Sequence, residues 1–166
     1  MEKYSRLIQF IAGLTGFMFG VLVYIIDRPP MYVPGFVSNL SLYNQDSVIS
    51  FGSFANNLPS FFHTFSFCLL LSCMTSQTKI KNTQILAFWL FVEISFELMQ
   101  GKPFKDWLVQ TQFFKENSGY ILRNISAFIN NGFFDTFDVV AILLGATLAY
   151  LLMLITSKEE KNEKIA

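Results

Sequence analysis

Residues 132–155 read GFFDTFDVVAILLGATLAYLLMLI, an apolar run that opens with two aspartates. No charged residue follows Asp138 before the run ends at Thr156. An uninterrupted apolar stretch of this length is typical of a transmembrane helix. The sequence therefore predicts a membrane-spanning helix whose first turn carries Asp135 and Asp138.

Three further apolar blocks precede this one. Of the 166 residues, 52% are hydrophobic, 14% are charged and twenty are phenylalanine, which is too apolar for an ordinary soluble domain. The second block has Asn57 as a candidate N-cap and Pro59 in its first turn. Only the polar turn 75–82 separates it from the third block, as in an antiparallel helix pair. The sequence predicts an all-α fold, with residues 1–166 forming a single polytopic membrane domain and four transmembrane helices in an antiparallel bundle. The expected helices are 7–26, 58–74, 83–100 and 134–156.

Small residues recur at helical spacing on the first and last of these helices. On the first helix they are Gly13, Gly16 and Gly20, and on the last they are Ala141, Gly145 and Ala149, on the same face as Asp138. Such faces let another helix approach closely. The pattern leaves open whether that helix belongs to the same chain or to a second copy.

The basic residues predict the orientation of the bundle. One side carries Lys3, Arg6, Lys79, Lys81, Lys158, Lys161 and Lys164. The other carries Arg28, Lys102, Lys105, Lys115 and Arg123. By the positive-inside rule the richer side, with both termini and the 75–82 turn, is expected in the cytoplasm. The twelve basic and twelve acidic residues cancel, so no charge pattern indicates nucleic acid as a partner.

The outward loop 101–133 has aromatic and apolar residues at roughly helical spacing. This pattern is compatible with interfacial helices on the outer leaflet and equally with an ordered loop packed on the bundle.

Ionisable residues of three helices are expected at a common depth near the outer surface. His63 lies about a turn into the second helix, Glu97 near the end of the third and Asp138 in the first turn of the fourth. Glu93, Glu97 and Gln100 form one polar stripe, since they are spaced i, i+4 and i+7. Ionisable groups inside a membrane usually face a partner or a wet cavity. The sequence therefore predicts a polar cluster beneath the outer head-group layer.

Neither a metal nor another cofactor is expected at this cluster. One histidine with two carboxylates is in principle a ligand set for iron, manganese or zinc. The chain has no HExxH-type spacing, however, and each ligand comes from a different helix. Cys68 and Cys73 share one apolar block and are expected to be small core residues, not a disulfide.

Three short motifs carry a family resemblance. They are HTFSF from His63, ELMQ over Glu97–Gln100 and DVVAILLG over Asp138–Gly145. In order, helix placement and Asp-to-Gly spacing, residues 58–156 resemble the VanZ-like membrane proteins, a family named for a teicoplanin-resistance protein. Ile142 stands where the family has an asparagine. The resemblance implies a bacterial cytoplasmic (inner) membrane protein with a role in the cell envelope, and it implies no particular reaction.

These observations support three hypotheses. In the first, the cluster binds a membrane lipid, either an envelope lipid or a lipid-linked envelope precursor. In the second, the protein is a scaffold or subunit that forms a homo-oligomer or joins a partner membrane protein. In the third, it is an intramembrane enzyme in which His63 and Glu97 exchange a proton and Asp138 orients the histidine. The expected binding residues are His63, Glu93, Glu97, Gln100, Asp135 and Asp138.

Overall fold

The computed structural model describes residues 2–27, 52, 56–75, 78–110, 129 and 132–163. Within these residues the regular structure is helical and no strand occurs, which confirms the all-α fold. The helices are α1 (Glu2–Asp27), α3 (Leu58–Cys73), α4 (Lys79–Met99), α5 (Lys102–Gln110) and α7 (Thr136–Glu163).

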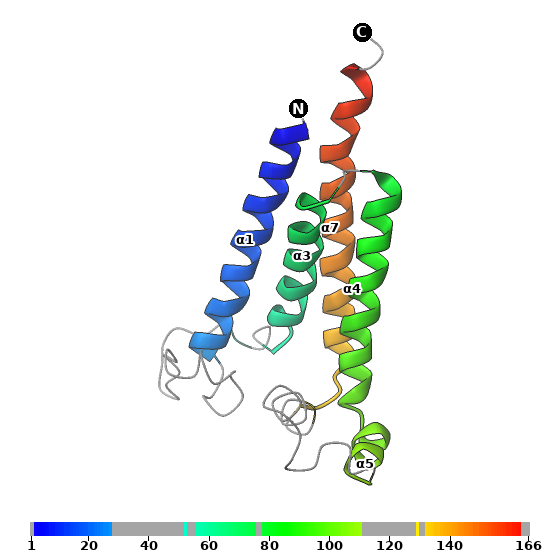
Figure 1. Ribbon diagram of the computed structural model, residues 1–166. Helices are drawn as coiled ribbons and strands as arrows, with labels where there is room; N and C mark the ends of the chain where they lie inside the picture. The colour runs from blue at the N-terminus through cyan, green and yellow to red at the C-terminus, as the bar shows by residue number, and fades with distance from the viewer. Residues whose placement is uncertain are drawn as a thin grey trace, which may run out of the picture.

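The four long helices lie side by side, and each runs antiparallel to the one before it in the chain (Figure 1). α3 and α7 each pack against the other three long helices and so form the centre of the bundle. The beginning of α1 and the end of α7 lie together at one end of the bundle, which we call the terminal end (Figure 1). α5 lies crosswise at the opposite end, where α3 and α7 begin and α4 ends. We call this the α5 end. Part of the 101–133 loop is therefore helical, and residues 111–128 lie outside the described part of the chain.

The helix boundaries follow local capping. α4 begins at Lys79, earlier than expected, because the Thr78 side chain accepts a hydrogen bond from the backbone N–H of Lys81. α7 begins after Asp135, whose Oδ1 accepts the N–H of Phe137 at 2.9 Å.

The start of α3 corrects one expectation. Pro59 occupies the first turn as predicted, but the Asn57 side chain makes no capping hydrogen bond. It donates instead to the carboxylates of Asp135 and Asp138. A carboxylate is a stronger acceptor, and α7 brings two of them within reach of this amide.

Two helices of the described chain are long and apolar enough to cross a membrane. They are Tyr4–Asp27 in α1 and Thr136–Thr156 in α7, with mean hydropathies of 1.9 and 2.5. Only 28% and 33% of these segments are buried within the bundle, whereas the core helix of a soluble protein is mostly buried. The outward faces are apolar; on α7 they expose Phe137, Val140, Leu143, Leu144, Leu148, Leu151 and Ile155. An exposed apolar surface of this extent is what a helix facing lipid presents.

The buried core and the small-residue faces of α1 and α7 lie at contacts between helices of the same chain. Cys68, Leu69, Ala149 and Met153 form the buried core, which confirms the prediction for Cys68. A Cβ added at Gly16 would meet the side chain of Ser66 on α3. A Cβ added at Gly145 would collide with the backbone carbonyl of Phe61. The glycines of α1 and α7 therefore let these helices pack closely against α3 of the same chain.

Candidate functional site

Three carboxyls gather at the α5 end, where α4 finishes and α7 begins. We call Glu97, Asp135 and Asp138 the acidic cluster. The hydroxyl of Ser60 donates to Oδ1 of Asp138 at 2.8 Å. The amide of Asn57 lies 3.2 Å from both Oδ1 of Asp138 and Oδ2 of Asp135. The first turn of α3 thus supplies the donors for the carboxylates at the start of α7.

Glu97 reaches the same cluster from α4. It is only 6% exposed, and it interacts with the side chain of Asp138 and the backbone N–H of Asp135. Oε1 of Glu97 is buried and accepts no hydrogen bond within the described chain.

His63 forms a separate pair one helical turn further into the bundle. Its Nδ1 lies 2.8 Å from Oε1 of Glu93 on α4. The side chain of His63 is 49% exposed and that of Glu93 only 12%. The edge of the imidazole packs against the ring of Phe67, with 4.5 Å between the ring centroids. This pair brings α3 and α4 into polar contact at that depth.

The structure thus divides the predicted cluster into two layers. Glu97 and Asp138 come together from α4 and α7, but the partner of His63 is Glu93 instead of Glu97. Asp138 is held by Asn57 and Ser60, so it does not orient the histidine. Glu93 and Glu97 are one turn apart, about 5.4 Å along the helix axis, so only one of them lies at the depth of His63.

The contacts of Asn57 and Ser60 with the acidic cluster were not predicted from the sequence. Asn57 was predicted only as an N-cap, and Ser60 was not among the predicted binding residues. Their i, i+3 spacing puts both side chains on one face at the start of α3. That face lies opposite the aspartates at the start of α7. The polar pair at this spacing was the sequence signal that could have identified Asn57 and Ser60 as contacts of the cluster.

Gln100 does not join the acidic cluster, and its side chain packs against Gly132. It caps the C-terminus of α4, and its side chain lies so close to Gly132 that a Cβ there would collide with it. Lys105 donates to the carbonyl of Gly132 and lies 4.9 Å from the centroid of the Phe133 ring. Gln100 and Lys105 thereby fix the segment that leads into Asp135.

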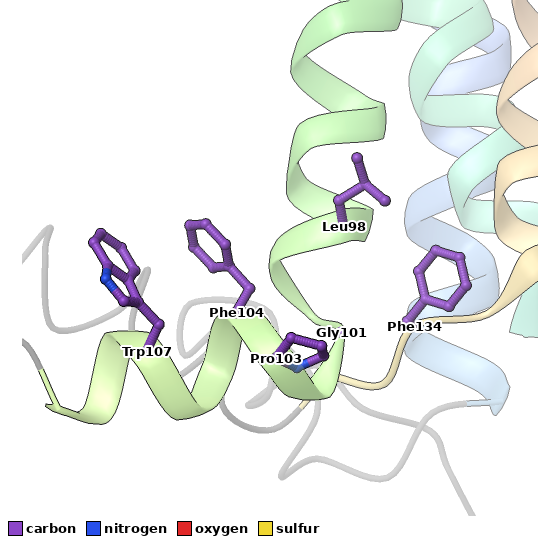
Figure 2. Close-up of a pocket in the computed structure, with 6 residues that line it drawn as sticks. All are labelled: Leu98, Gly101, Pro103, Phe104, Trp107 and Phe134. Carbon is purple, nitrogen blue, oxygen red and sulfur yellow. The ribbon is translucent and has the colours of Figure 1, made fainter.

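An apolar groove lies at the same end of the bundle as the acidic cluster. It has a volume of about 480 Å³ and is lined by Leu98, Gly101, Pro103, Phe104, Trp107 and Phe134. Figure 2 shows Phe104 and Trp107 projecting from α5 toward the side on which α4 rises. Leu98 directly follows Glu97 and Phe134 directly precedes Asp135, so the groove and the carboxyls share the same backbone segments.

Polar pairs also join the helices at the terminal end. Nε2 of Gln9 on α1 donates to the hydroxyl of Thr156 on α7 at 2.7 Å. The hydroxyl of Ser72 on α3 donates to Oδ1 of Asn82 on α4 at 2.9 Å. All four side chains are buried, so these contacts hold the helices together.

Over the residues that the structure describes, no group of three or more His, Cys, Asp or Glu side chains is placed to hold a metal ion. Comparison of the chain with protein-family models, with curated proteins and with solved structures finds no match.

Proposed function

We propose that this chain is a VanZ-like integral membrane protein with four transmembrane helices, and that it binds an envelope lipid or a lipid-linked precursor at the α5 end. The proposal puts the protein in a bacterial cytoplasmic membrane with both termini in the cytoplasm. The α5 end then lies in the outer leaflet. The distribution of lysine and arginine supports this orientation.

The apolar surface of the bundle supports four spans. α1 and α7 have the length and hydropathy of membrane helices. α4 is long enough, since 21 residues extend about 31 Å at about 1.5 Å per residue. α3 is shorter, but it lies at the centre of the bundle and is covered on its sides by the other three helices. The proposal therefore treats α3 as an inner span and α4 as an outer span whose exposed side chains, Phe88 and Phe91 among them, face lipid.

One observation carries the binding proposal: the apolar groove and the acidic cluster adjoin at the same end of the bundle. A molecule that fills both must be amphiphilic, with an apolar chain against Leu98 and Phe134 and a polar head near Asp138. The volume of the groove lies within the usual range of ligand pockets, about 300–1,000 Å³. At the outer membrane surface the most abundant amphiphile is lipid. We therefore favour lipid binding over the other two hypotheses.

Lipid retention tests the proposal. The full chain is extracted in mild detergent, and bound lipids are counted by native mass spectrometry. Phe134→Ala and Trp107→Ala remove walls of the groove and are expected to reduce lipid retention strongly. Phe88→Ala is the matched control, because Phe88 is an exposed phenylalanine on α4 outside the groove. Equal retention in the groove variants and in Phe88→Ala would argue against this function.

A scaffold is the second candidate, favoured by the polar contacts that join the helices at both ends. Under this function the acidic cluster only fastens α3, α4 and α7 together. Glu97→Gln and Ser60→Ala would then lower thermal stability in detergent, and any loss of bound lipid would follow the loss of stability. Lipid loss from a variant that melts like the wild type would exclude the scaffold reading.

A further inference from the structure

Within the described residues, the acidic cluster receives hydrogen bonds only from neutral groups. Asp135 and Asp138 accept from the Asn57 amide, the Ser60 hydroxyl and the backbone N–H of Phe137. Glu97 accepts from the backbone N–H of Asp135. In the part of the chain that the structure describes, no lysine or arginine forms a salt bridge with these three carboxyls. Among the described residues, the negative charge of the cluster therefore has no basic partner.

A buried acceptor at the cluster also lacks a donor. Glu97 is only 6% exposed, and its Oε1 is shielded from solvent. This oxygen makes no hydrogen bond within the described chain. Leaving such an oxygen without a partner is unfavourable, more so in a low-dielectric surrounding. Within the described part of the chain, the site therefore lacks both a donor for Oε1 of Glu97 and a positive charge.

We infer that the acidic cluster binds the primary ammonium group of a lipid head group, an inference that rests on the proposed lipid-binding function. A primary ammonium supplies both missing features, since it has three N–H donors and a charge of +1. Asp135 and Asp138 are partly buried and form the accessible rim of the site, and Glu97 forms its floor. A quaternary ammonium has no N–H to donate and cannot satisfy Glu97.

The neighbouring groove identifies the source of the ammonium as a lipid. Leu98 and Phe134 line the groove and are next in sequence to Glu97 and Asp135. An acyl chain in the groove would bring its head group to the end of the bundle where the carboxyls lie. A free amine would gain only the polar half of this site.

Head-group selectivity tests the inference on the purified full chain. Dissociation constants are measured by native mass spectrometry for phosphatidylethanolamine, phosphatidylcholine and phosphatidylglycerol with identical acyl chains. We expect phosphatidylethanolamine to bind at least about ten-fold more tightly than the other two, because hydrogen bonds to charged groups are the stronger kind. Glu97→Gln and Asp138→Asn should abolish this preference and retain the weaker, chain-driven binding.

Glu93→Gln is the matched control, since it neutralises a glutamate one turn away on the same helix. It should keep the preference for phosphatidylethanolamine. The thermal stability of each variant is measured in parallel, and Glu97→Gln alone decides the result if Asp138→Asn does not fold.

The outcomes separate the two proposals. Equal affinity of the wild type for all three lipids would overturn the ammonium inference and leave lipid binding intact. Absence of binding to any of them would overturn both. Stabilisation by ethanolamine alone, to the same extent as by phosphatidylethanolamine, would assign the site to a soluble amine and overturn the lipid assignment.

Discussion

Ser60 donates its hydroxyl hydrogen to Oδ1 of Asp138 at 2.8 Å and so joins the first turn of α3 to the first turn of α7. The two residues are 78 positions apart in the chain. Asn57 adds a second donor to the same oxygen from one turn away. The aspartates that open α7 are therefore part of a contact between helices as well as a helix start.

Ser60→Ala should weaken this contact. We expect the free energy of unfolding to fall by about 0.6 kcal/mol, and by at most about 1.7 kcal/mol, the range for interhelical hydrogen bonds in membranes. The measurement is reversible unfolding in mixed micelles. Thr147→Ala serves as the control, because the Thr147 hydroxyl bonds only to the carbonyl of Leu143 within α7. A larger effect at Thr147 would contradict the assigned role of Ser60.

The pair of His63 and Glu93 should be energetically coupled. In a double-mutant cycle of His63→Ala and Glu93→Gln we expect a coupling energy above about 0.5 kcal/mol, as for residues in direct contact. The cycle of His63→Ala with Glu97→Gln should give a smaller coupling, since Glu97 contacts Asp138 instead. The reverse order would restore Glu97 as the partner of histidine.

Gly145→Ala should separate α7 from α3. The added methyl group meets the backbone carbonyl of Phe61, which cannot rotate away as a side chain would. Overpacking of this kind typically costs about 1–3 kcal/mol. The thermal midpoint in detergent should fall accordingly. Leu144→Ala, on the exposed face of the same helix, should change the midpoint much less.

The proposed orientation predicts which sites face the cell exterior. Asp106→Cys lies on α5 and should react with a membrane-impermeant maleimide in intact cells. Lys79→Cys lies at the start of α4 and should react only after the membrane is permeabilised. The wild type is the control, because Cys68 is buried in the bundle and the Cys73 thiol bonds to the Leu70 carbonyl. Labelling of both introduced cysteines from outside would exclude a span through α4.

α5 should lie in the interface with its aromatic residues in the lipid. The chain has two tryptophans, so Trp89→Phe leaves only Trp107. Lipids brominated near the head group should quench the fluorescence of Trp107 more than lipids brominated near the chain end. The complementary variant, Trp107→Phe, leaves only Trp89, which packs against Phe67. Lipids brominated near the head group should quench Trp89 less than they quench Trp107. Unquenched Trp107 would mean that α5 stands clear of the bilayer.

The sequence by itself determined the presence of the four long helices, and it determined which two of them are long and apolar enough to cross a membrane, since both depend on local features. Long apolar runs, Pro59 in a first turn and Asp135 before a helix act over a few neighbouring residues. The close approach of helices at Gly16 and Gly145 was also foreseen, because a glycine face has that use in any bundle.

Only the tertiary structure decided which polar residues meet. Glu93 and Glu97 lie on one stripe of α4, and the spacing within a helix does not reveal which of them lies level with His63. That choice depends on how far α4 is shifted along α3, and a shift of one turn, about 5.4 Å, exchanges one glutamate for the other. The same packing turned Asn57 away from the end of its own helix toward the carboxylates of α7. Side-chain patterns along one helix determine its faces, but the axial offset between helices arises from the packing of all four.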